Sequence, residues 1–113
     1  MDYPEAIAAA RAFRDTRDWG QFHNPKDLAI SISIEAGELL EVFQWSGNDL
    51  NVEERHMSLE DELADVAIYC LFLSDAVGAD LPELMMRKLK KNEEKYPAEK
   101  ARGNAIKYTN LQS

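Results

Sequence analysis

Two pairs of acidic residues constrain the fold of this chain more than any other feature of its sequence. Glu35 with Glu38, and Glu62 with Asp65, are each three positions apart, so each pair lies on one face of a helix. Apolar residues directly follow both pairs, which is not typical of a solvated helix face. Four carboxylates near a core would repel one another and would be costly to remove from water. The pattern therefore predicts packed helices around a bound divalent cation with oxygen ligands.

The cation that suits these ligands is a hard one. Carboxylate oxygens without a thiolate cluster favour Mg²⁺, with Mn²⁺ as the alternative. A di-iron bundle also uses carboxylates but needs two Glu-x-x-His motifs, and the sequence has one, from Glu53 to His56, in a polar stretch. Gly37 lies inside the first acidic pair, and a glycine inside a helix suggests that something approaches the backbone closely.

The rest of the chain is predicted to be all-α, because it has no useful alternation of period two. Start and stop signals delimit four helices, which we expect to form a four-helix bundle core within a domain of residues 1–97. Residues 19–23 are predicted as a loop, residues 50–57 as a loop with a short helical turn, and residues 98–113 as an arm that is poorly ordered or contacts another subunit. The helices are expected from Asp2 to about Arg17, from Asn24 to about Trp45, from Ser58 to about Val77 and from Asp80 to Tyr96.

The third predicted helix is apolar around nearly its whole circumference between Leu63 and Leu73. A helix of this kind requires burial on all sides, and four helices of one small chain can hardly surround one of their own. We therefore expect a homo-oligomer, with the third or the second helix at the subunit contact.

The composition and charge of the chain limit the kinds of molecule that it is expected to bind. The net charge of −8 on 113 residues disfavours a long nucleic acid, although a small polyphosphate that arrives with metal is compatible with it. The N-terminus does not resemble a signal peptide, no stretch approaches the ~20 apolar residues of a membrane span, and the single Cys70 cannot form a disulfide within the chain. We expect a cytoplasmic protein without a membrane partner.

Basic and aromatic side chains supply candidate ligands for such a polyphosphate. Lys88 and Lys95, with Asn92 between them, share the spacing of one helix face and could meet phosphate oxygens, although a solvated face has the same pattern. Core packing is the ordinary role of an aromatic residue, but tryptophans in loops can also stack on a nucleobase. The candidates are Trp19, Trp45 and Tyr69, the last on the same helix face as Asp65.

These motifs, taken in order, resemble the all-α nucleotide pyrophosphohydrolases of the MazG-like superfamily, and in particular the single-domain branch that includes dCTP pyrophosphatases. The resemblance covers about residues 3 to 97. It rests on RDWxQFHxP at residues 17–25, ExGELxExFQW at 35–45, ELxDVxIY at 62–69 and KxxxNxxKYP at 88–97.

The resemblance implies an Mg²⁺-dependent enzyme that cleaves (deoxy)nucleoside triphosphates between the α and β phosphates, as a house-cleaning activity on non-standard or surplus deoxynucleotides. It implies a four-helix bundle assembled as a dimer or tetramer, and we favour the tetramer. By the resemblance, the metal is bound by Glu35, Glu38, Glu62 and Asp65. The general base could be Glu35, Glu38 or Glu41. By the resemblance, Trp19 and Trp45 stack on the base. The sugar or the phosphates are contacted by Tyr69, Asn92 and, on weaker grounds, Lys88 and Lys95.

Two alternatives stay open at this point. One is a relative in the same superfamily, such as a dimeric dUTPase or a phosphoribosyl-ATP pyrophosphohydrolase. The other is a non-catalytic helical oligomerisation module, which would explain the apolar third helix but not the four acids within apolar runs.

Overall fold

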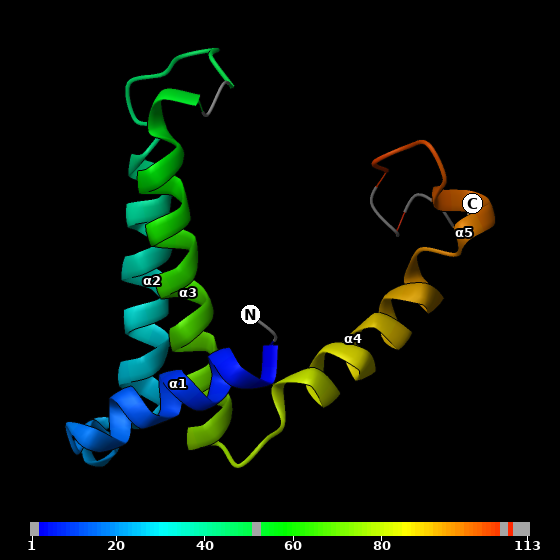
Figure 1. Ribbon diagram of the computed structural model, residues 1–113. Coiled ribbons are helices and arrows are strands. Elements are labelled where there is room, and N and C mark those ends of the chain that lie inside the picture. The colour runs from blue at the N-terminus through cyan, green and yellow to red at the C-terminus, as the bar shows by residue number, and fades with distance from the viewer. Residues whose placement is uncertain (1–2, 51–52, 107–108, 110–113) are drawn as a thin grey trace. The chain divides into compact units, whose positions relative to one another are not determined.

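The computed structural model describes residues 3–50, 53–106 and 109, and these residues form helices, turns and loops without a strand (Figure 1). The all-α class predicted from the sequence is therefore confirmed. The helices in chain order are α1 (Tyr3–Thr16), the 3-10 helix η1 (Trp19–Phe22), α2 (Pro25–Glu41), the 3-10 helix η2 (Glu53–Arg55), α3 (His56–Ala76), α4 (Leu81–Lys95) and α5 (Ala98–Ala101).

The chain divides into two compact units, Met1–Gly78 and Ala79–Ser113. In the first unit, α2 and α3 are joined by a loop at one end and run antiparallel along each other, while α1 packs against α3 (Figure 1). The second unit contains α4 and α5. The four-helix bundle and the division at residue 97 stay predictions.

Local signals in the sequence set several helix ends as expected. Asn24 caps α2, because its side chain accepts a hydrogen bond from the backbone N–H of Asp27, and Pro25 occupies the first turn. Asp80 caps α4 in the same way through the N–H of Glu83. Gly78 ends α3 with a φ of 70°, a left-handed conformation that favours glycine.

Other boundaries differ from the sequence prediction. α2 ends at Glu41, four residues before Trp45, because the chain tightens there into successive turns with hydrogen bonds between residues three apart, such as Val42 N–H to Leu39 O. α3 begins at His56 rather than at a Ser58 cap, since η2 leads directly into its first turn. The predicted loop at residues 19–23 contains η1, and the predicted arm contains the short helix α5. The predicted helix start at Asp2 lies outside the described residues.

The buried apolar core of the described residues is small and consists of Leu28, Leu71 and Phe72. All three lie toward the end of the α2–α3 pair where α2 begins and α3 ends. By contrast, Leu63 is 57% exposed on α3, although this helix is apolar nearly all round. The other helices of the first unit therefore leave much of α3 uncovered, and the homo-oligomer stays a prediction. None of the described helices is both long and apolar enough to span a membrane.

Candidate functional site

The antiparallel pairing of α2 and α3 brings three of the four predicted carboxylates together. Glu35 on α2 and both Glu62 and Asp65 on α3 offer ligand oxygens that all lie within 4.8 Å of one another. Glu35 and Glu62 are half-buried between the helices, and Asp65 is exposed. Glu62 and Asp65 are three residues apart, so one face of α3 supplies two of the ligands. The arrangement makes a compact, open-sided cluster of oxygen atoms.

The electrostatics of this cluster show that its carboxylates are strongly coupled. Burial, a hydrogen bond with Glu38 and repulsion from neighbouring carboxylates raise the pKa of Glu35 from 4.5 to about 7. Burial, followed by a hydrogen bond with Glu38 and repulsion from Glu38 and Asp65, also raises the pKa of Glu62. The fourth predicted acid, Glu38, is thus close enough to Glu35 and Glu62 to affect both of them.

Two oxygen atoms of the cluster are suited to a cation. Glu35 Oε2 and Glu62 Oε2 are buried and accept no hydrogen bond from any described residue. A buried acceptor without a donor is costly unless a cation or water meets it. The groups that converge are all carboxylates, which are the ligands preferred by Mg²⁺ and Mn²⁺. The residues present therefore fit a hard divalent cation.

The di-iron alternative gains no support from the position of His56. This histidine is 59% exposed at the start of α3, where its Nε2 lies 2.9 Å from Glu60 Oε1. It is not among the groups that converge with Glu35.

The three predicted aromatic ligands occupy different places along the first unit. Tyr69 is half-buried on α3, one turn after Asp65, and its ring meets that of Phe72 edge-on at 6.3 Å. Trp19 lies in η1, just before α2, and packs edge-on against Phe13 at 5.5 Å. Trp45 follows the other end of α2 and is 91% exposed. Because α2 is 17 residues long, about 25 Å, Trp19 and Trp45 of one copy lie at opposite ends of this helix.

The predicted phosphate ligands lie in the second unit. Lys88, Asn92 and Lys95 share the helical spacing of one face of α4, with Lys88 exposed and the other two half-buried. Their assignment to the substrate stays a prediction.

Sequence reasoning missed an ion-pair network that joins α1 to α3. Asp75, near the end of α3, accepts hydrogen bonds from Arg11 at 2.8 and 3.0 Å and from Arg14 at 2.7 Å. Arg14 also lies over the Phe72 ring, whose neighbour His23 has a pKa lowered by burial and by the Arg14 charge. The two arginines at helical spacing were a weak signal, but nothing in the sequence indicated Asp75 as their partner.

Comparison with known proteins identifies the family of this chain. Residues 30–111 match the model of the MazG-like family, so this chain belongs to the MazG-like family. It is 38% identical over 104 residues to proteins named dCTP pyrophosphatase 1 from Mus musculus, Rattus norvegicus and Homo sapiens. Each alignment covers 88% of this chain but 61% of the relative, so the chain spans about three fifths of their length.

A solved structure is also similar. The crystal structure of a pyrophosphatase from Archaeoglobus fulgidus superposes with a TM-score of 0.74 at 46% sequence identity. The superposition covers 83% of this chain and 91% of that one, so the likeness extends over nearly the whole archaeal protein.

Proposed function

We propose that this chain is an Mg²⁺-dependent nucleoside triphosphate pyrophosphohydrolase. It hydrolyses (deoxy)nucleoside triphosphates to the monophosphate and pyrophosphate and removes non-standard or surplus deoxynucleotides. The observation that carries this proposal is the carboxylate cluster of Glu35, Glu62 and Asp65 in a chain of the MazG-like family. The relatives named dCTP pyrophosphatase 1 and the similar archaeal pyrophosphatase support the same class of reaction.

In this proposal Glu35, Glu62 and Asp65 hold the cation, and Glu38, predicted from the sequence as a fourth ligand, adjoins them. Mg²⁺, when bound, neutralises part of the triphosphate charge and makes the phosphorus more electrophilic. Without a cation, a cluster of acids would repel a substrate that carries about four negative charges. The carboxylates therefore serve to hold a cation that the triphosphate oxygens can bind, on a protein of net charge −8.

Glu38 is best placed to act as the general base that takes the proton of the attacking water. Its half-buried carboxyl adjoins the cluster through Glu35 and Glu62, but its oxygens are not among the three groups that converge. Glu41 is exposed and is not among the groups that shift the pKa of Glu35 or Glu62. The water oxygen bonds to the α phosphorus as its proton passes to Glu38, and the bond from that phosphorus to the α–β bridging oxygen breaks. Pyrophosphate leaves with the electron pair of that bond.

The remaining predicted ligands act on other parts of the substrate. Trp19 and Trp45 stack on the base, which is a contact that every base can make. Tyr69 and Asn92 contact the sugar or phosphates, and Lys88 and Lys95 meet phosphate oxygens left uncovered by the metal. The functional unit is a homo-oligomer, for which we favour a tetramer over a dimer.

A panel of nucleoside triphosphates with MgCl₂ and detection of pyrophosphate tests the activity. Hydrolysis in ¹⁸O-labelled water tests the bond that is cleaved, because attack at the α phosphorus places the label in the monophosphate. Label in the pyrophosphate, or release of inorganic phosphate alone, would contradict the proposal. Exclusive turnover of dUTP or of phosphoribosyl-ATP would instead favour one of the two related enzymes.

The non-catalytic alternative is separated from the enzyme by calorimetry. A titration with a non-hydrolysable deoxynucleoside triphosphate analogue should give binding heat in MgCl₂ and much less in EDTA. Absence of metal-dependent binding would favour an oligomerisation module.

A further inference from the structure

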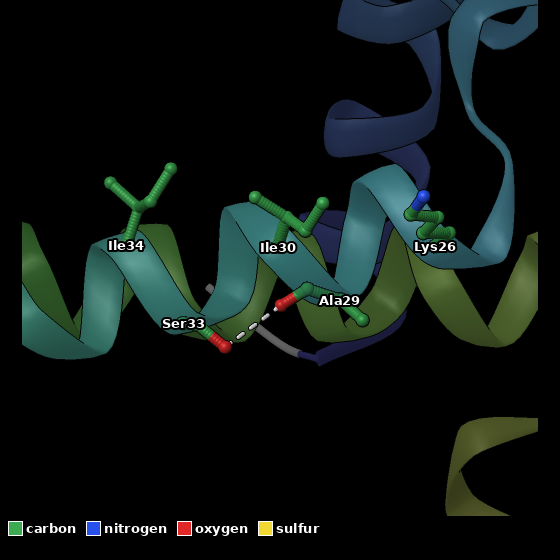
Figure 2. A pocket seen from close by; sticks show the side chains of 5 residues that line it. All are labelled: Lys26, Ala29, Ile30, Ser33 and Ile34. Carbon is green, nitrogen blue, oxygen red and sulfur yellow. Dashed lines mark hydrogen bonds between the residues drawn. The ribbon is translucent and has the colours of Figure 1, made fainter.

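The outer face of α2 carries an apolar surface that α3 does not cover. Leu28, on the inner side, is 2% exposed, whereas Ile30 and Ile34 are 48% and 55% exposed. Figure 2 shows these two isoleucines projecting from the same side of α2. They line a shallow apolar hollow together with Lys26, Ala29 and Ser33.

Gly37 gives this face a second unusual property. A Cβ atom built on Gly37 would meet no atom of the described chain within 4 Å, so packing within the described residues does not require glycine here. Glycine is nevertheless among the least favourable residues inside a helix. Its presence is explained if a side chain or backbone from outside the chain approaches α2 at this point.

Charges flank the surface in a complementary way. Lys26 and Glu41 are both exposed, at the two ends of α2. At 100° per residue, Lys26, Ile30, Gly37 and Glu41 fall within one sector of about 60° on the helix, on the side opposite Leu28. The stripe therefore runs from a positive end, through an isoleucine and a glycine, to a negative end.

We propose that the outer face of α2 packs antiparallel against the same face of α2 in a second copy of this chain. A two-fold axis between Ser33 and Ile34 would set Lys26 of one copy level with the partner's Glu41. The same register sets Ile30 level with the partner's Gly37, so that a large side chain meets a position without one. The surface is thus complementary to itself in both shape and charge, as a two-fold contact requires.

This inference deepens the proposed homo-oligomer by naming its contact, and it has a consequence for the proposed substrate site. Trp19 and Trp45 lie at opposite ends of α2, so they cannot flank one base within a single copy. Antiparallel pairing brings Trp19 of one copy to the same end of the helix pair as the partner's Trp45. A base held between both tryptophans would then be bound by two chains.

Charge reversal tests the contact without relying on activity. Lys26→Glu alone and Glu41→Lys alone should each raise the dissociation constant of the full-length oligomer at least about 10-fold, because each places two like-charged pairs in the contact. The double variant Lys26→Glu/Glu41→Lys should restore it to near the wild-type value. Sedimentation velocity at micromolar concentration measures the masses, and circular dichroism checks that each variant is folded.

Cross-linking tests the register independently. In a Cys70→Ala background, Ile30→Cys combined with Gly37→Cys should form a disulfide-linked dimer on oxidation. The two positions are seven residues apart on one helix, about 10 Å, and therefore cannot link within a chain. Ile30→Cys alone is the matched control and should stay monomeric on a non-reducing gel.

The possible results distinguish a failure of this contact from a failure of the proposed homo-oligomer. A monomeric wild-type chain would overturn both the homo-oligomer and this contact. An oligomeric wild type whose mass is unchanged by both single reversals, with no disulfide-linked dimer, would overturn this contact alone and leave another surface to hold the copies together.

Discussion

Glu35 on α2 and Glu62 on α3 hold their carboxylates within 4.8 Å of each other and of Asp65, so three acidic groups converge at one place between the two helices. One oxygen of each glutamate is buried and accepts no hydrogen bond from the described residues. Packing of α2 on α3 therefore depends on how this negative charge is neutralised. In the absence of metal, protons can neutralise it, and in its presence a cation can do so.

The first prediction concerns the pH dependence of stability without metal. The pKa of Glu35 rises from 4.5 to about 7 in the folded chain, so the folded state binds more protons than the unfolded state between these values. The free energy of unfolding in EDTA should therefore fall as pH rises from about 4.5 to about 7. Thermal unfolding at pH 5, 6, 7 and 8 measures this trend, and MgCl₂ should raise Tm most at the upper end.

Glu35→Gln serves as the control for this pH effect. The amide cannot ionise, so the loss of Tm with rising pH in EDTA should become smaller, and so should the gain from MgCl₂. An equal slope in the variant and the wild type would show that Glu35 is not the group responsible.

The second prediction concerns the role of the α3 carboxylates in turnover. Glu62→Gln removes a charged ligand from the cluster and should lower kcat/KM about 100-fold or more, while circular dichroism shows an intact helix. The matched control is Glu60→Gln on the same helix, whose carboxylate is 55% exposed and paired with His56. Pyrophosphate release at saturating MgCl₂ compares the two variants. Equal activity would remove Glu62 from the site.

Local structure could be predicted from sequence where a single residue decides it. Asn24, Asp80 and Gly78 mark helix ends by backbone chemistry that operates within a few residues. The end of α2 was not predicted, because the apolar pattern continues through Trp45 while the backbone tightens into turns after Glu41. Pattern alone does not separate an α-helical turn from a tighter one.

The candidate site could likewise be predicted from the sequence only in part. The spacing of Glu62 and Asp65 was sufficient to place both on one face of α3, and the apolar flanks indicated that this face is partly buried. The partnership of Asp75 with Arg11 and Arg14 depends on how α1 crosses α3, which no local pattern encodes. The separation of Trp19 from Trp45 likewise follows from the length of α2 and not from either motif.

The third prediction concerns the ion pairs between α1 and α3. Asp75 is 20% exposed and binds two arginines, which hold the pKa of its carboxyl below the usual 3.8. Asp75→Asn should lower the free energy of unfolding by about 2 kcal/mol, as is typical for the loss of hydrogen bonds to a charged group. Asp15→Asn, whose carboxylate is 65% exposed and pairs with Arg14, should cost about 0.5 kcal/mol or less. Urea unfolding at pH 7 compares them.

The sign of the pH effect at Asp75 is opposite to that at Glu35. A carboxyl with a lowered folded pKa stabilises the chain above its unfolded pKa, and this stabilisation is lost as pH falls through the folded value. The difference in stability between wild type and Asp75→Asn should therefore shrink below about pH 4. A difference that stays constant down to pH 2 would exclude the ion pairs as its source.

The fourth prediction separates the two tryptophans. Trp45 is 91% exposed, so Trp45→Ala should change the free energy of unfolding by about 0.5 kcal/mol or less while weakening nucleotide binding by about 1–3 kcal/mol. Leu50→Ala, at a position 87% exposed, is the matched control and should leave binding unchanged. Trp19→Ala should reduce both stability and binding, because Trp19 packs against Phe13 and lies 5.9 Å from the Arg17 guanidinium. Calorimetry with a non-hydrolysable analogue and urea unfolding measure the two effects.

The fifth prediction joins the tryptophans to the proposed contact of α2 with a second copy. If each base lies between Trp19 of one chain and the partner's Trp45, co-expression of Trp19→Ala and Trp45→Ala chains should produce hybrids in which one of two sites keeps both rings. Random pairing makes half of the dimers hybrid, so about a quarter of the wild-type activity should return. The control is either variant expressed alone, which should keep only its own low activity. Co-expressed chains that show no more than the mean of the two variants would place both tryptophans outside a shared site, since no hybrid would then contain a complete one.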